Sequence, residues 1–358
     1  MRARGLTGRS ESAAPPARRR AWLALAAMVG MTGLLGVMNV IVDPIGVFRS
    51  ALFDPVVLPA RRAKFERLGR YPTVPDTVVL GSSRAFSMSP ATLTRRGGGT
   101  AFNASVEGGS PIDDVAFLRF MLARWGRLPR TLILALSPEE LIPGDEMIQQ
   151  DPGNPLLPYW GRVPSARARW HRRGLAVDPD TTVMSVVALV DAWRDRRPVR
   201  WFRFDPDGGA QFPPIFDEPS TRADLFRKAL SMRRGWFETP RPVSALQREA
   251  LAEVLTLSRA HAVRVLAYLP PNHPYLLTYW RSAPWFDRAA AATVRFLWAT
   301  PGVNLTVCDF RDPTSLGRPA GDELYDVVHP TKALNDEIVA RLETGRCRPE
   351  RSASGGRP

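Results

Sequence analysis

The sequence predicts an α/β fold, with a parallel β-sheet and helices on both of its faces. Short apolar segments rich in β-branched residues recur along the chain, and segments with helical periodicity lie between them. The strand segments are apolar almost throughout, as expected for strands that are buried on both faces. A chain of 358 residues is long enough to form a large domain with a substantial core.

The elements follow one another in a regular order until one segment interrupts them. The expected strands are 77–80, 100–105, 131–136, 263–269 and 303–308, and the expected helices are 112–125, 243–261, 285–298 and 332–342. The interruption, residues 141–241, is rich in Pro, Trp and Arg and has helical patterns near 179–195 and 220–233. We interpret it as an insertion at one edge of the sheet. Its tryptophans predict a small satellite core, with stacking on sugar rings as the alternative.

A segment near the N-terminus has the length and composition of a membrane-spanning helix. Residues 21–42 contain no charged side chain, and a helix of that length would extend about 33 Å, enough to cross the hydrocarbon core. Three arginines, Arg18 to Arg20, precede it, so the positive-inside rule leaves the N-terminus in the cytoplasm. The alternative, a cleaved signal peptide, would need a shorter apolar region and a small-residue cleavage site. We therefore expect a single-pass anchor in the cytoplasmic (inner) membrane, with the main domain periplasmic or otherwise extracytoplasmic.

The distribution of charge and of cysteines excludes some functions. Of the net charge of +14, eight charges lie in the two ends of the chain, and no basic stripe with interleaved aromatics remains to indicate nucleic-acid binding. The cysteines and histidines form no metal-ligand pattern, so we expect neither a metal nor a cofactor. Cys308 and Cys347 either form a disulfide or remain two buried thiols. The expected organisation is a basic tail (1–20), an anchor (21–42), a connector (43–75), the main domain (76–345) and a flexible tail (346–358).

Two short motifs suggest nucleophilic chemistry. Gly81-Ser82-Ser83-Arg84 follows the first strand, and ligands of open α/β sheets bind beyond the carboxyl ends of strands. Near the other end of the chain, Asp326 and His329 are three residues apart, before the last helix. At that spacing a carboxylate can orient an imidazole, whose far nitrogen can take a proton from a serine. Each motif alone has an ordinary alternative: a Gly-Ser turn, and a helix cap beside a surface histidine.

A third motif, residues 101–114, follows the second strand and reads AFNASVEGGSPIDD. Gly108 and Gly109 can bring backbone N–H groups close to a substrate. An ordinary glycine turn, with Ser110 as the N-cap of the next helix, is the alternative.

Together, G-x-S, N-A-S-x-x-G and D-x-x-H resemble the SGNH (GDSL-type) hydrolase superfamily in order and spacing, over about residues 75–345 without the insertion. The resemblance implies a flavodoxin-like sheet and a serine hydrolase site that needs no cofactor. It implies Ser83 as the nucleophile, His329 as its base and Asp326 as the carboxylate that orients the base. Gly108 corresponds to the glycine that donates its N–H to the oxyanion.

The sequence departs from that family after the third strand. Family hydrolases usually place G-x-N-D there, whereas this chain has Ser137-Pro138-Glu139-Glu140. A carboxylate would repel an oxyanion, and losing one donor costs about 2–4 kcal/mol, so we expect reduced activity. Asn103 and Asn272 are the candidate substitute donors. Asn272 and His273 either face the site or belong to a turn.

The combination of anchor, VDPIGVF connector, GSSR and FNAS resembles membrane-tethered SGNH-like proteins. Its arrangement is also similar to that of the acetyltransferases of bacterial alginate and other exopolysaccharides. We therefore expect a serine esterase or O-acyltransferase that acts on acetyl groups of cell-surface or secreted polysaccharide, with export or assembly proteins as partners. Arg84 either contacts an acidic sugar or forms a salt bridge within the fold. The alternative function is a catalytically weak scaffold that binds glycan or assists an export complex.

Overall fold

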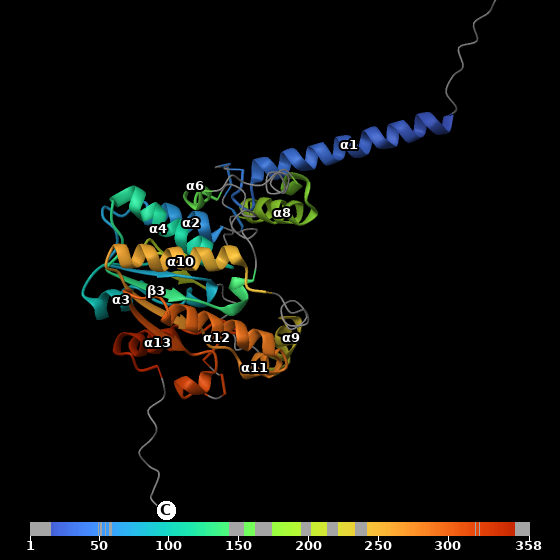
Figure 1. Cartoon of the computed structure of the whole chain (residues 1–358). Coiled ribbons are helices and arrows are strands. Elements are labelled where there is room, and N and C mark those ends of the chain that lie inside the picture. Colours follow the sequence, from blue (N-terminus) through green and yellow to red (C-terminus); the bar gives the residue numbers. More distant parts are fainter. Residues whose placement is uncertain are drawn as a thin grey trace, which may run out of the picture.

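A five-stranded parallel sheet forms the centre of the molecule (Figure 1). The computed structural model describes residues 16–347 except 49, 51, 54, 57–58, 143–153, 162–173, 195–201, 213–220, 233–241, 319 and 322. The strands are β1 (Thr77–Leu80), β2 (Ala101–Asn103), β3 (Thr131–Ala135), β6 (Arg264–Leu269) and β7 (Asn304–Asp309), in the order β2-β1-β3-β6-β7. The strand order reverses between β1 and β3, which is where open α/β sheets bind ligands.

Helices cover both faces of this sheet because its strands are apolar on both sides. Val78 and Leu80 of β1 pack in one core and Val79 packs in the other, and all three are fully buried. The first core lies under α2 (Ala60–Leu68), α4 (Pro111–Trp125) and α10 (Ala245–Ala260), and the second under α3 (Pro90–Gly97) and α13 (Lys332–Thr344). With α12 (Pro284–Trp298), the expected strands and helices of the α/β fold are confirmed. Among the described residues outside the insertion, the helices that were not foreseen are α2, α3 and α11 (Pro274–Arg281).

The N-terminal helix α1 (Pro16–Val42) extends away from the domain (Figure 1). By length and composition it could cross a membrane over Arg18–Val42. Asp43 ends the helix with a positive φ of 47°. Its carboxylate accepts hydrogen bonds from the N–H groups of Val47 and Ser50, at 2.6 and 3.1 Å. This turn directs the chain from the helix into the domain.

The segment expected to be only a connector contributes α2 to the core. Lys64 of this helix is fully buried, and its Nζ donates to the carbonyl oxygens of Asn103, at 2.8 Å, and Gly208. The ammonium also lies 4.5 Å from the ring centroid of Phe204. Burial lowers the pKa of Lys64 well below its usual value. One side chain therefore joins the connector, strand β2 and the insertion.

The insertion does not lie at a single edge of the sheet, contrary to expectation. Its described elements are α6 (Leu157–Trp160), η3 (Leu175–Val177), α8 (Pro179–Trp193), β4 (Arg203–Phe204), β5 (Ala210–Gln211) and α9 (Arg222–Met232). Helix α6 packs on α4, the β4–β5 hairpin bonds to β2, α8 packs on α1, and α9 packs on α11. The predicted satellite core is also wrong for the described tryptophans, since Trp160 joins the main core and Trp193 is exposed. Trp170, Trp201 and Trp236 lie outside the described residues.

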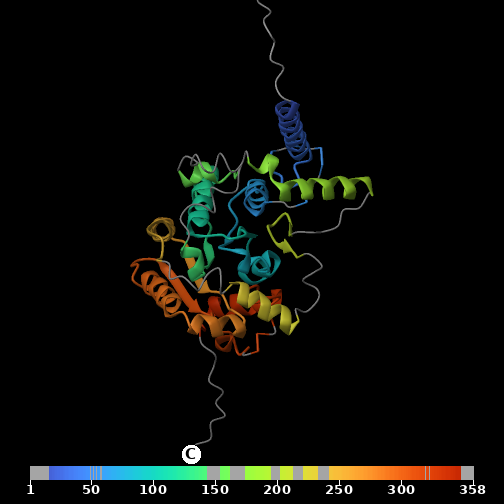
Figure 2. The same ribbon diagram turned by 90° about the vertical axis from the view of Figure 1, so that its right-hand side faces the viewer.

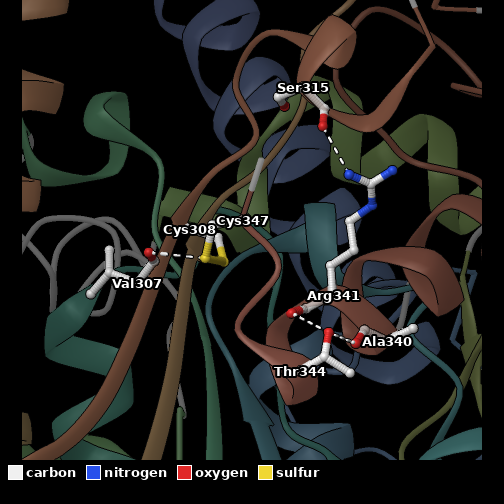
Figure 3. Close-up of a disulfide and its surroundings, with 7 residues drawn as sticks. All are labelled: Val307, Cys308, Ser315, Ala340, Arg341, Thr344 and Cys347. Carbon is white, nitrogen blue, oxygen red and sulfur yellow. Dashed lines mark hydrogen bonds between the residues drawn. A yellow bond between two sulfur atoms is a disulfide. The ribbon is translucent and has the colours of Figure 1, made fainter. Parts of the chain in front are cut away.

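A disulfide joins Cys308 of β7 to Cys347, just after α13 (Figure 3). Of the two alternatives for these cysteines, the structure therefore has the bonded one. The bridge closes a segment with a sequence separation of 39 and ties the last helix to the edge strand. Residues 348–358 of the expected flexible tail lie outside the described residues.

Candidate active site

The site begins at the carboxyl end of β1, where the chain turns sharply at Gly81. Its φ is +118°, and a Cβ there would come within 2.4 Å of the carbonyl oxygen of Ala135 on β3, so only glycine fits. The chain then forms a short 3₁₀ turn over Ser83–Ala85, which the Ser82 hydroxyl caps by accepting from the N–H of Arg84 at 3.4 Å. Ser82 is thereby buried and Ser83 is left partly accessible.

Ser83, His329 and Asp326 form a continuous chain of contacts. The Ser83 hydroxyl lies 3.0 Å from Nε2 of His329, and Nδ1 of the same ring lies 2.8 Å from Oδ2 of Asp326. The other carboxylate oxygen of Asp326 accepts from the N–H groups of Val328 and His329, at 2.8 and 2.9 Å. The structure thus brings Ser83 together with Asp326 and His329, which lie more than 200 positions further along the chain. The three predicted residues have the arrangement of a nucleophile, a base and an orienting carboxylate.

Hydrogen bonds between buried side chains hold the two segments of this site together. The Ser87 hydroxyl donates to the carbonyl of Pro330 at 2.6 Å, so the serine turn is bonded directly to the residue after His329. Asn335, on α13, donates to the Ser87 hydroxyl at 2.7 Å. The separation between the Ser83 hydroxyl and the imidazole is therefore fixed by contacts outside the reactive groups.

Asp326 also forms an ion pair with Lys228 of α9. Burial opposes ionisation of this carboxyl, but the proximity of His329 and of the Lys228 ammonium outweighs it and holds the pKa of Asp326 well below its usual value. Sequence reasoning missed Lys228 because it lies in the insertion, nearly a hundred positions from Asp326, in no recognisable motif.

Two backbone N–H groups, one in the serine turn and one in the loop that lies against it, are candidates for binding an oxyanion. The loop after β2 lies against the serine turn: Val106 donates to the Gly81 carbonyl at 2.9 Å, and a Cβ on Gly109 would approach that oxygen to 2.3 Å. Within the described part of the chain, the N–H groups of Ser83 and Gly108 have no hydrogen-bond acceptor. Gly108 is the donor that the sequence resemblance implied.

Asn103 does not act as a substitute oxyanion donor in this structure. Its amide donates to the carbonyl oxygens of Ala85 and Met88, at 2.8 and 2.9 Å, and its side-chain oxygen accepts from the Ser105 hydroxyl at 2.6 Å. The side chain is fully buried and its amide hydrogens are already used. Asn103 instead stabilises the backbone that follows Ser83, through its hydrogen bonds to Ala85 and Met88.

Asn272 is likewise part of a turn and not a donor to the site. Its amide donates to the Pro270 carbonyl at 3.1 Å, and its side-chain oxygen accepts from Arg84 at 2.9 Å. His273 caps α11, with Nδ1 accepting from the N–H of Tyr275 at 3.2 Å. Burial lowers the pKa of His273. Both residues are therefore bonded within a turn, and His273 also lies close enough to Asp326 for that carboxylate to oppose the lowering of its pKa.

Arg84 forms a salt bridge within the fold, with Glu139, and is not placed to contact a sugar. Both side chains are almost fully buried, with exposed fractions of 4% and 7%. The neighbouring Glu140 carboxyl accepts from the N–H of Ser137 at 3.1 Å and bonds to the Ser82 hydroxyl. Burial, together with the Glu139 charge, raises the pKa of Glu140 to about 8, so this carboxyl is protonated at neutral pH.

Comparison with known proteins identifies no relative: no protein-family model matches the chain, and no curated protein matches it significantly. Among the described residues, no three His, Cys, Asp or Glu side chains are grouped so that they could hold a metal ion. Function is therefore inferred from the geometry around Ser83 and His329.

Proposed function

We propose that this chain is a membrane-anchored, extracytoplasmic serine esterase or O-acyltransferase of the SGNH type. The observation that carries the proposal is the chain of contacts from the Ser83 hydroxyl through His329 to Asp326, at 3.0 and 2.8 Å. A serine hydroxyl is inert at neutral pH unless a base accepts its proton, and these distances are within the range for that transfer.

In the proposed reaction, the Ser83 oxygen attacks the acyl carbonyl carbon while Nε2 of His329 takes the hydroxyl proton. Asp326 keeps the ring in the required tautomer and stabilises the imidazolium. The N–H groups of Ser83 and Gly108 donate to the oxyanion. When the tetrahedral intermediate collapses, His329 returns the proton to the leaving alkoxide, and an acyl-enzyme remains on Ser83. Water or a sugar hydroxyl, deprotonated by His329, then attacks the acyl carbonyl, and His329 returns the proton to the Ser83 oxygen as it leaves.

The proposed substrate is an O-acetylated cell-surface or secreted polysaccharide, and polysaccharide export proteins are the proposed partners. This part rests on the sequence resemblance. Two features support an extracytoplasmic domain: the arginines before α1, and the disulfide between Cys308 and Cys347, a bond that persists in oxidising compartments. A reporter enzyme active only outside the cytoplasm, fused after residue 345, should be active. Activity only of a cytoplasmic reporter would reverse this orientation.

The direct test of the enzymatic proposal is covalent labelling of the purified full chain by a fluorophosphonate, together with hydrolysis of an activated acetyl ester. Labelling should map to the peptide that contains Ser83. Esterase and transferase are then separated by adding an acetylated donor with a polysaccharide acceptor and measuring free acetate against transferred acetyl groups.

One observation favours a second function, a catalytically weak scaffold that binds glycan or assists export. The amides of Asn103 and Asn272 are both bonded elsewhere, so neither supplies the side-chain donor that related hydrolases place in the oxyanion hole. A chain that neither labels nor turns over any acyl donor, but binds polysaccharide, would favour this function.

A further inference from the structure

Helix α8 of the insertion has its large apolar side chains on the outside. Residues 181–190 contain no charged side chain. The exposed residues repeat at helical spacing, and Val183 and Trp193 are 62% and 83% exposed. This outer stripe comprises Val183, Val186, Val190 and Trp193, whereas the buried face comprises Thr181, Ser185 and Ala188. A helix on the surface of a water-soluble domain has the opposite pattern.

The small, polar face of α8 is used to bind α1. Asn39 of α1 is fully buried, and its amide donates to the Thr182 hydroxyl at 2.9 Å and to the Ala176 carbonyl at 2.8 Å. Ser185 donates back to the Asn39 side-chain oxygen at 2.8 Å. Close approach is helped by Gly36, where a Cβ would lie 3.3 Å from the Val177 side chain. The contacts with α1 therefore use the opposite face of α8, and the outer stripe remains exposed.

The position of this contact along α1 indicates what α8 faces. If the span begins at residue 21, Asn39 lies about 27 Å further along the helix, at the far boundary of a hydrocarbon core about 30 Å thick. Helix α8 runs across the direction of α1 at this level (Figure 2). A helix at that depth and in that direction lies in the interface between headgroups and acyl chains, where tryptophan is enriched.

We propose that α8 is an interfacial helix, with its outer stripe resting in the lipid bilayer beside the point where α1 emerges. The partner is the lipid surface itself, because α8 is bonded to the membrane span and its apolar stripe continues the apolar surface of that span. Val177, between the two helices, is itself about half exposed. The inference rests on the proposed anchor but not on catalysis. With α1 and α8 both in the bilayer, the catalytic domain would be held in one orientation above the membrane.

The test measures lipid contact at three positions of the full-length chain. Single cysteines replace Val186, Val29 or Trp298 and carry an NBD fluorophore, attached without reductant so that the native disulfide remains. Val29 lies midway along α1, and Trp298, on α12, is the control because it is an exposed apolar residue of the main domain, at 61% against 49% for Val186. The protein is reconstituted into phosphatidylcholine–phosphatidylglycerol vesicles that contain lipids with a nitroxide at a shallow or a deep acyl position.

The probe at 186 should lose most of its emission to the shallow nitroxide, the probe at 29 to the deep nitroxide, and the probe at 298 to neither. Val190→Cys should give the same result as the probe at 186, which guards against a local folding defect in either variant.

If position 29 is quenched and position 186 behaves like 298, the proposal fails while the anchor stands. If position 29 is also unquenched, the anchor fails as well. A probe at 186 that is shielded from aqueous iodide yet untouched by lipid nitroxides would show a protein surface over α8, and would also overturn the proposal. Fluorophosphonate labelling is independent of all these outcomes.

Discussion

Two consecutive residues, Ser83 and Arg84, lead into two clusters of charged and polar side chains at the same edge of the sheet. The open cluster comprises Ser83, His329, Asp326 and Lys228, and the closed cluster comprises Arg84, Glu139, Glu140 and Asn272. Each cluster pairs a cation with a carboxylate. They differ in burial, since Lys228 is 44% exposed whereas Arg84 and Glu139 are almost inaccessible.

This difference shows that a place at the carboxyl ends of the strands is not enough to make a residue functional. In the closed cluster, both ends of the ion pair are buried under the serine turn, where an unpaired charge would be costly. In the open cluster, the hydroxyl and the imidazole that meet are both partly exposed. Damage to the closed cluster should therefore lower stability, and damage to the open cluster should lower the rate with the fold intact.

The largest effect should come from Ser83→Ala, which removes the proposed nucleophile of the open cluster. We expect complete loss of fluorophosphonate labelling and loss of acetyl-ester hydrolysis to the background level. His329→Ala should lose nearly as much, because members of a triad act as a unit. The matched control is Ser82→Ala, which should keep most of the activity, since Ser82 caps the turn and bonds to Glu140. Equal losses from the two serines, in folded protein, would contradict the assignment.

Asp326→Asn should lower kcat by about 10⁴-fold with the fold intact, because an amide at this position favours the wrong tautomer of His329. The two backbone N–H groups that Asp326 accepts from can still bond to the amide oxygen, so the loop should keep its shape. Steady-state kinetics and the melting temperature should be measured on the same sample. A variant that melts far below the unmodified protein would show instead that Asp326 has mainly a structural role.

Glu139→Gln should act on stability, because it leaves the Arg84 guanidinium buried without its counter-charge. Breaking a buried ion pair by removing one partner costs about 3–5 kcal/mol, so the melting temperature should fall by several degrees. Replacing both partners, as Arg84→Met with Glu139→Leu, should recover much of the loss. The control is Arg96→Met, which removes an exposed pair with Glu343 and should cost about 0–1 kcal/mol. Loss of activity at an unchanged melting temperature would show instead that the Arg84–Glu139 pair contributes to the reaction and not to stability.

The open cluster was easier to predict from the sequence than the closed one, for a physical reason. Its predicted residues lie in short local motifs, with Ser83 just after a strand and Asp326 and His329 just before a helix. The alternation of strands and helices brings these two points to the same edge of the sheet. The parallel sheet was predictable because strands buried on both faces are apolar throughout.

The surroundings of these residues depend on long-range packing, which leaves no local pattern. Whether Asn103 points toward an oxyanion or toward the carbonyl of Ala85 is decided by the fold of the turn above it. The pairing of Lys228 with Asp326 depends on the course of an insertion whose parts pack in four different places. The missed helix α2 has polar and charged residues, such as Lys64, that are buried only because they find specific partners.

The closed cluster should also make stability depend on pH through Glu140. Its pKa is raised to about 8 in the folded protein, mainly by burial, from an ordinary value near 4.5. Below the ordinary value both states hold the proton. As the pH rises toward 8, only the unfolded state releases it, so this group makes the protein progressively less stable over that range. Glu140→Gln should remove this dependence, giving a melting temperature that is higher than the unmodified protein's at pH 8 and similar at pH 4.5. Thermal melts of both proteins between pH 4.5 and 8 test this prediction. If the melting temperatures of the two proteins change in parallel with pH, Glu140 is not the cause of the dependence.

The smallest effect should come from Lys228, the exposed member of the open cluster. Its ammonium helps to hold the pKa of Asp326 below its usual value, so this carboxyl stays ionised and can orient the ring that accepts the Ser83 proton. Lys228→Met should therefore move the acid limb of the kcat/KM profile to higher pH. Because the Lys228 ammonium is partly exposed and solvent screens its charge, the shift should be less than about one pH unit.

Lys228→Arg should leave that limb in place, since it keeps the charge. Arg227→Met is the control on the same helix, because Arg227 is more exposed and pairs with Asp224 on α9 instead of with the site. The other titratable group facing Asp326 is His273, whose burial favours its neutral form, so it should contribute little charge at neutral pH. The same shift from Arg227→Met would mean that the general charge of α9, and not the pair with Asp326, sets the pH profile. A shift toward lower pH in Lys228→Met would contradict the role given to this lysine.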